Sequence, residues 1–210
     1  MSNQRNIFLI GLVLVIIVII AGIFWVKTYS TPKKVPEIHG FLLPETKGVP
    51  PFALQKADGS SFTEKNFMGH WSLVFFGYTH CPDICPETMT RLLEVLQKLD
   101  SAAQKVRILF ISVDPARDTP QSLHTYLGAF DAQHIVGLTG TVQQIEDLAK
   151  TYRVAYEAGT ADTHENYEVM HSSAIYIFDP QGHARLMATG SDSAENIAHD
   201  LRLLIQKSPA

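Results

Sequence analysis

The N-terminal part of the chain has a hydrophobic pattern of its own. The 20 residues from Ile7 to Val26 carry no charge, and their aliphatic side chains would cover every face of a helix. At about 1.5 Å per residue such a helix is about 30 Å long, which matches the hydrocarbon core of a bilayer. Signal peptides have shorter apolar regions of roughly 7 to 15 residues and a small-residue cleavage site. The pattern predicts an uncleaved membrane anchor at 7–26 behind a short tail at 1–6.

The rest of the chain alternates short apolar runs with helical patterns, which is typical of an α/β domain. The polar, proline-bearing stretch 27–40 predicts a linker, and one domain is expected at 41–210. Nearly continuous apolar runs at 71–78 and 106–113 predict central strands, and 173–179 predicts a third.

Helices are expected between and after these strands. Thr119 followed by Pro120 predicts a capped helix start, and Thr141 predicts another. A last helix is expected at 193–206. The segment between the first two strands has large apolar side chains at helical spacing, namely Met89, Leu92, Leu93, Leu96 and Leu99.

Two β-hairpins frame this core in the predicted order of elements. One turns at Asp58-Gly59, and the other turns between Pro180 and Gly182. This order suits a thioredoxin-like domain: an early hairpin, a βαβα run, a second hairpin and a terminal helix. A flavodoxin-like sheet is a rival on pattern alone.

Charge narrows the range of partners. The 210 residues have a formal net charge of −4, which argues against a nucleic-acid partner. Arg5 precedes the apolar run, whereas Lys27, Lys33 and Lys34 follow it. Positive charge therefore does not decide the orientation of the anchor.

The chain has two cysteines, Cys81 and Cys85, in "YTHCPDICPETM". A proline inside a helix costs about 3 kcal/mol, so we expect the following helix to begin at Pro86. Cys85 would then be the N-cap, with Cys81 in the preceding loop. The positive end of the helix favours a thiolate, so a lowered pKa is expected.

Three interpretations of the two thiols compete. A purely structural disulfide would close so small a ring that it adds only about 2 kcal/mol. A redox dithiol and a metal site both remain open. For a metal the thiolates need a third ligand, and His171, just before a predicted strand, is the leading candidate among nine histidines. His80 adjoins Cys81, and His164 lies in a polar loop.

Four sequence blocks follow one another in the chain: "FFGYTHCPDICP" (75–86), "SVDPARDTP" (112–120), "YEVMHSS" (167–173) and "IFDPQG" (177–182). In this order they resemble the Sco/SenC family of membrane-anchored copper chaperones. The resemblance implies a thioredoxin-like fold behind a single N-terminal transmembrane helix.

The resemblance also implies that Cys81, Cys85 and His171 bind copper and that Asp114 lies near the site. Soft thiolates favour Cu(I) and imidazole accepts either oxidation state, although zinc also accepts such a ligand set. An alternative role for Asp114 is turn chemistry before the helix at Thr119. Met170 replaces the aspartate that often precedes the family histidine, and packing is favoured over copper ligation for it.

By resemblance, the protein delivers copper to the binuclear site of cytochrome c oxidase subunit II and helps to assemble it. The resemblance also places the domain in the periplasm, anchored in the inner membrane. A mitochondrial location is disfavoured because the six residues before the span are too few for an Arg-rich transit peptide. Another periplasmic copper donor or a thiol reductant would be a further partner. The alternatives are a thiol-disulfide oxidoreductase acting on the acceptor's cysteines and, more weakly, a thiol peroxidase.

Overall fold

A computed structural model describes residues 2–29, 37–44, 48–130, 133–152, 154–157 and 167–207 of the chain. The chain forms two compact units, Met1–Glu37 and Ile38–Ala210. Half of the predicted linker at 27–40, namely residues 30–36, lies outside the described residues.

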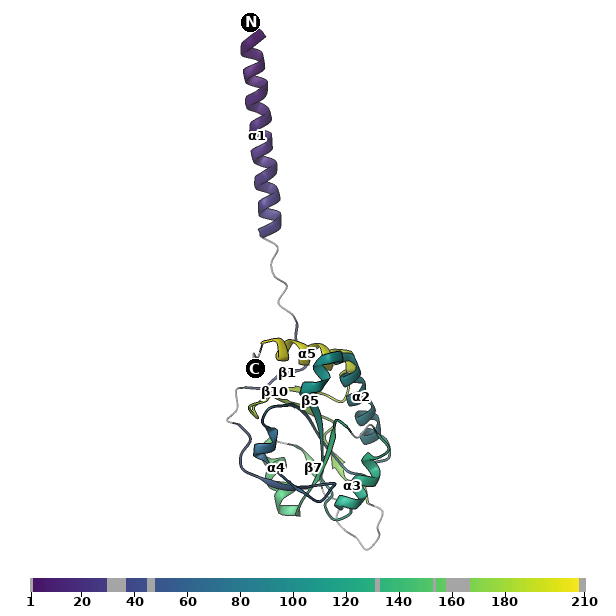
Figure 1. Ribbon diagram of the computed structural model, residues 1–210. Coiled ribbons are helices and arrows are strands. Elements are labelled where there is room, and N and C mark those ends of the chain that lie inside the picture. The colour runs from purple at the N-terminus through teal and green to yellow at the C-terminus, as the bar shows by residue number, and fades with distance from the viewer. Residues whose placement is uncertain are drawn as a thin grey trace. The chain divides into compact units, whose positions relative to one another are not determined.

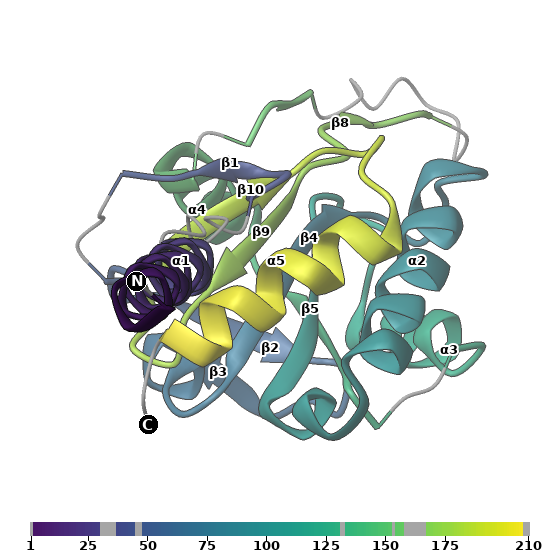
Figure 2. The same ribbon diagram turned by 90° about the horizontal axis from the view of Figure 1, so that it is seen from above.

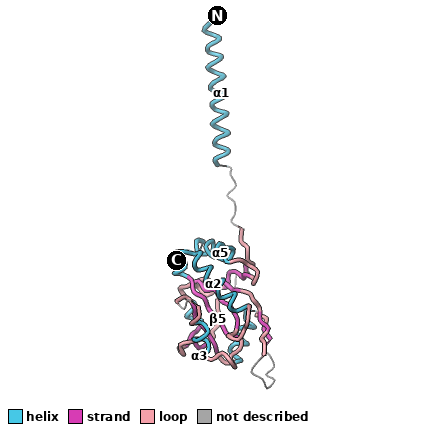
Figure 3. Tube along the Cα trace, turned by 90° about the vertical axis from the view of Figure 1, so that its right-hand side faces the viewer, coloured by secondary structure: helices cyan, strands magenta, loops and turns pink. Residues whose placement is uncertain are grey.

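The described residues 2–29 of the first unit form one helix, α1 (Ser2–Tyr29), which Figures 1 and 3 show without a break. Its side chains are described for Leu9 and for residues 11–27, and they are exposed. Among the helices of the described residues, none qualifies by length and apolarity as a membrane span.

The second unit is built on an eight-stranded mixed sheet with the order β1-β10-β9-β4-β5-β6-β2-β3. The strands β4 (Trp71–Gly77), β5 (Val106–Ser112) and β6 (Ile135–Thr139) are parallel to one another. The other strands pair antiparallel: β1 (Phe41–Leu42), β2 (Ala53–Lys56), β3 (Ser61–Thr63), β9 (Ile175–Phe178) and β10 (Ala184–Ala188). A separate two-stranded sheet joins β7 (Tyr156–Glu157) to β8 (Met170–His171).

Helices cover both faces of the sheet. The long helices α2 (Ile84–Leu99) and α5 (Ala194–Lys207) pack against each other beside the sheet (Figure 2). Aromatic contacts place α3 (Pro120–Leu127) on the face of β5 that carries Phe110, and α4 (Val142–Tyr152) on the face of β9 that carries Phe178. Short 3₁₀ helices occupy Glu64–Phe67 and Asp100–Lys105.

Most of the predicted elements are confirmed. The three predicted strands are β4, β5 and β9, and both predicted hairpins form, as β2–β3 and β9–β10. Thr119 and Thr141 each accept a hydrogen bond from the backbone N–H three residues later, so these two caps are as expected. Ser193 caps the last helix in the same way, although the sequence predicted only a helix at this place. The antiparallel hairpins at both sides of the parallel strands exclude the flavodoxin-like alternative, whose core sheet is parallel.

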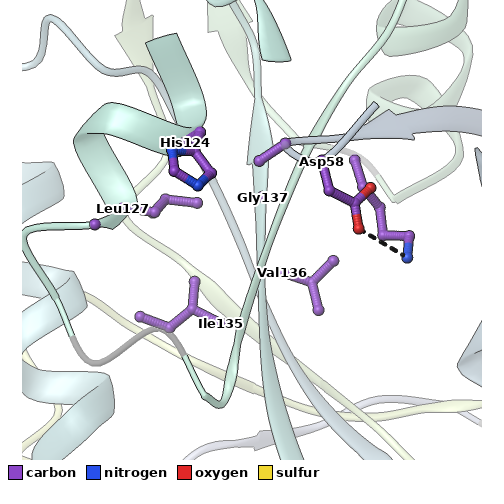
Figure 4. A pocket seen from close by; sticks show the side chains of 9 residues that line it. Asp58, His124, Leu127, Ile135, Val136 and Gly137 are labelled. Atoms are coloured by element: carbon purple, nitrogen blue, oxygen red, sulfur yellow. Dashed lines mark ion pairs between the residues drawn. The ribbon is translucent and has the colours of Figure 1, made fainter. Parts of the chain in front are cut away.

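The strand β6, which lies between β5 and β2 in the sheet, was not predicted from the sequence. Its middle residue is Gly137, and a Cβ there would lie 2.4 Å from Cδ1 of Leu127 on α3. The glycine therefore lets the helix approach the strand, although it weakens the strand signal in the sequence. Figure 4 shows the cavity of about 250 Å³ beside this contact, where His124 and Asp58 also lie.

Candidate metal centre

The cysteines lie where β4 leads into α2. The helix begins at Ile84 with Asp83 as its N-cap, so Cys85 is the second helical residue and Pro86 the third. The predictions of a start at Pro86 and of Cys85 as the N-cap are therefore wrong. The backbone N–H groups of a first helical turn have no partner within the helix, so a proline in that turn forfeits no hydrogen bond.

Folding brings together three of the predicted residues. Cys81 comes from the loop, Cys85 from α2 and His171 from β8, and one ligand atom of each lies within 4.8 Å of the others. The Sγ of Cys85 is 3.4 Å from Nε2 of His171. The backbone N–H of Cys85 donates to Sγ of Cys81 over 3.4 Å. Both cysteines are free thiols.

Burial governs the electrostatics of this cluster. The Cys85 side chain is fully buried, and this burial raises the pKa of its thiol. The expected lowering is therefore wrong for Cys85, because loss of solvation outweighs the favourable field of the helix start. Partial burial lowers the pKa of His171, which keeps its imidazole neutral near pH 7.

The tautomer of His171 follows from its neighbours. Its Nδ1 lies 3.2 Å from the carbonyl oxygen of Ser172. A carbonyl oxygen can only accept, so Nδ1 carries the hydrogen and Nε2 presents its lone pair toward Cys85. Fixing one ring nitrogen in this way is how proteins orient a histidine ligand.

Aromatic rings and a glycine shape the space around the ligand atoms. The rings of Phe75 and Tyr78 contact the edge or face of the His171 ring, with centroids 5.8 and 5.6 Å away. A Cβ at Gly77 would lie 2.7 Å from Sγ of Cys85. The glycine in "FFGYTHC" is thus required for the close approach of α2 to the end of β4.

A cavity of about 370 Å³ opens beside the cluster, and Cys81 and His171 line it. Ile84 and Met170 also line this cavity, and both side chains are exposed. With 69% of its surface exposed, Met170 does not have the packing role expected from the sequence.

The predicted neighbour Asp114 is buried, but it is not part of the ligand cluster. One carboxylate oxygen accepts a hydrogen bond from the hydroxyl of Tyr167 over 2.6 Å, and the other is paired with Arg117. The guanidinium of Arg117 stacks on Tyr167, 3.6 Å from the ring centroid, and also lies over Tyr78. Asp114 therefore joins the chain before β8 to Arg117 in the loop after β5, and Arg117 in turn contacts Tyr78 after β4.

Asp118 was not among the site residues predicted from the sequence. This fully buried carboxylate accepts hydrogen bonds from the backbone N–H and hydroxyl of Thr79 and from the hydroxyl of Ser112. It thus anchors the loop that carries Cys81 to the end of β5. The sequence shows an aspartate soon after a predicted buried strand. This position alone does not predict a bond to Thr79, because Thr79 lies 39 residues away in the sequence.

Two further histidines were considered for the site. His80 is exposed, and its Nδ1 lies 3.9 Å from Asp118, so its ring is not among the three ligand residues. His164 lies outside the described residues.

Comparison with known proteins adds independent findings. The family model SCO1/SenC matches residues 43–206. The human protein named "Protein SCO1 homolog, mitochondrial" is 40% identical over 134 residues, which cover 63% of this chain and 44% of the human protein. The chain thus spans less than half the length of that relative.

Solved structures show the same fold. The crystal structure of Arabidopsis thaliana ScoI with copper bound has a TM-score of 0.71 and 35% identity, covering 78% of this chain and all of that one. The structure of BsSco, described as having a disulfide switch and as a member of the Sco family of cytochrome c oxidase assembly proteins, has a TM-score of 0.61 and 26% identity, covering 77% of this chain and 95% of its own. The thioredoxin-like α/β fold is thereby confirmed. Because the SCO1/SenC family model matches residues 43–206, most of the length of this chain, the chain belongs to the SCO1/SenC family.

Proposed function

We propose that this protein binds copper through Cys81, Cys85 and His171 and delivers it to the binuclear copper site of cytochrome c oxidase subunit II. The observation that carries the proposal is the convergence of these three donors within 4.8 Å beside an open cavity. Membership of the family and the copper bound to the Arabidopsis relative support it.

The donor set suits copper as a cargo. Two thiolates favour Cu(I), and a neutral imidazole completes a three-ligand shell. Three protein ligands leave room for a thiolate of the acceptor to enter, so the metal can pass by ligand exchange. Zinc accepts the same donors, and the copper-bound relatives favour copper over zinc.

The proposal includes a membrane tether at 7–26, with the domain in the periplasm. The uninterrupted apolar run supports it, as do the exposed aliphatic side chains along α1. A tether raises the effective concentration of carrier and acceptor in the same membrane. The native protein is then expected to stay in the membrane fraction after alkaline carbonate extraction, whereas release into the supernatant would contradict the tether.

Thiol-disulfide exchange is a second candidate function. Both cysteines are free, the Cys85 N–H contacts the Cys81 sulfur, and BsSco is described as having a disulfide switch. Against a reductase or a peroxidase, burial raises the pKa of Cys85 and so depletes the reactive thiolate.

A transfer experiment tests the leading proposal. The full chain in detergent is loaded with Cu(I) under anaerobic conditions and mixed with the reduced, metal-free copper domain of subunit II. We expect copper to move to the acceptor, and a Cys81→Ser, Cys85→Ser variant to carry none. A metal-free chain that reduces an oxidised acceptor, without any copper transfer from the loaded chain, would instead support the reductase.

Copper affinity is expected to increase with pH. Because the pKa of the Cys85 thiol is raised, this group is protonated in the free protein and must release its proton when it binds metal. Below that pKa, each unit increase in pH should strengthen binding about tenfold for this one proton. Protons do not compete with copper for His171 near neutral pH, since the pKa of its imidazole is lowered. Competition titrations at pH 6, 7 and 8 measure the slope, and a flat profile would contradict the protonated thiol.

A further inference from the structure

A second cluster of potential metal ligands lies apart from the cysteines. His39 precedes β1, while His199 and Asp200 are neighbours on α5. One ligand atom of each lies within 4.8 Å of the others. Among the described residues, this cluster and the cysteine cluster are the two groups of three or more His, Cys, Asp or Glu residues whose ligand atoms all lie so close together.

Asp200 fixes the two histidine-bearing segments relative to each other. Its carboxylate is buried, and Oδ2 accepts the backbone N–H groups of His39 and Gly40 over 2.9 and 2.8 Å. Its Oδ1 lies 3.1 Å from Nδ1 of His199. An ionised carboxylate can only accept, so Nδ1 of His199 carries the hydrogen and Nε2 keeps a free lone pair.

This arrangement is the one that metal-binding histidines usually have, with the other ring nitrogen donating to a carboxylate. The second imidazole is close, because the ring centroids of His39 and His199 are 5.1 Å apart at an interplanar angle of 68°. His39 is exposed and the His199 side chain is 38% exposed, so an ion can reach both rings from solvent. Metal–nitrogen bonds of about 2.0–2.1 Å place two such donors at most about 4 Å apart, so one ion can bind both rings only if the exposed His39 ring turns its nitrogen toward Nε2 of His199.

We propose that His39 and His199 form a second metal site for a divalent ion of borderline softness, Cu²⁺ or Zn²⁺, with Asp200 orienting the His199 imidazole and holding the backbone of His39. Imidazole and carboxylate donors select such ions, whereas the thiolates of Cys81 and Cys85 select Cu(I). The bound ion links the segment at the start of the domain to α5. This inference stands independently of the proposed copper delivery.

The test uses the full chain in detergent with Cys81→Ser, Cys85→Ser and His171→Ala substitutions, so that the first cluster cannot contribute. Calorimetric titrations with CuCl₂ and, separately, ZnCl₂ are expected to show one equivalent bound. Cu²⁺ should give a paramagnetic resonance spectrum with nitrogen and without thiolate coordination. Zn²⁺ should also raise the melting temperature, because an ion that binds only the folded state stabilises it.

Adding His39→Ala or His199→Ala should weaken this binding by about tenfold or more, since even a partner outside the ligand shell contributes 10–100-fold. His39→Ala keeps the backbone N–H groups that bond to Asp200, so a loss of binding cannot be ascribed to unfolding. It should also abolish the Zn²⁺-dependent increase in melting temperature.

His183→Ala is the matched control. His183 is 37% exposed, and its Nδ1 lies 3.4 Å from the buried carboxylate of Asp179, but it belongs to neither described ligand cluster. Binding should persist in this variant. The proposal is overturned if the background chain binds neither ion, if His39→Ala and His199→Ala both bind as tightly as their parent, or if His183→Ala weakens binding equally.

Discussion

Replacing His171 with alanine is expected to abolish tight Cu(I) binding. The variant would leave the two cysteines, of which Cys85 has a thiol with a raised pKa, and no neutral donor at 3.4 Å from Cys85. Loss of an outer partner of a metal site costs about 10–100-fold in affinity, so loss of the ligand itself should cost more than 100-fold. An anaerobic competition titration of the full chain in detergent measures this loss.

Two control variants separate ligation from packing. His80→Ala removes an imidazole next to Cys81, but the exposed ring of His80 faces Asp118, so copper affinity should be unchanged. His171→Met removes the ring contacts with Phe75 and Tyr78 yet keeps a soft donor, and should recover part of the affinity. If His171→Ala binds Cu(I) as tightly as the native chain, His171 is not a ligand.

The sequence predicted those parts of the fold that local patterns determine. The strands β4 and β5 are continuous apolar runs because both of their faces are covered, and Thr119 and Thr141 cap helices through bonds to residues three positions away. The three candidate ligands could also be predicted, because the sequence blocks that contain them resemble the Sco/SenC family. The distance in sequence between Cys85 and His171 gave no geometric information by itself.

What the sequence did not predict depends on tertiary contacts. The helix begins at Ile84 because a first-turn proline is tolerated, which the spacing of Cys85 and Pro86 alone did not indicate. The raised pKa of Cys85 comes from burial under neighbours that pack only in the folded domain. Likewise β6 was missed because Gly137, which β-propensity disfavours, is needed for the contact with Leu127.

The role of Asp118 depends on hydrogen bonds to residues far away in the sequence, so it could not be predicted from the neighbouring residues alone. Asp118→Ala is expected to destabilise the domain by about 3 kcal/mol or more. The substitution removes the acceptor for the N–H and O–H of Thr79 and for the O–H of Ser112, and each buried group left without a partner costs about 1–3 kcal/mol. Urea unfolding of the native chain and the variant measures the difference. Asp58→Ala is the matched control, because its carboxylate also accepts an N–H and an O–H, both from Ser60, but in an exposed turn.

The same variant tests whether the anchoring of the loop matters for copper. Thr79 lies two residues before Cys81, so without Asp118 the loop loses its bonds to the end of β5 and Cys81 is held less firmly near Cys85 and His171. Copper affinity measured below the unfolding transition should therefore decrease by about 10–100-fold, the usual effect of losing a supporting partner. Asp58→Ala should bind copper as the native chain does. A destabilised Asp118→Ala with native copper affinity would show that the loop holds Cys81 in place without its bonds to Asp118, and that Asp118 contributes to stability without ordering the site.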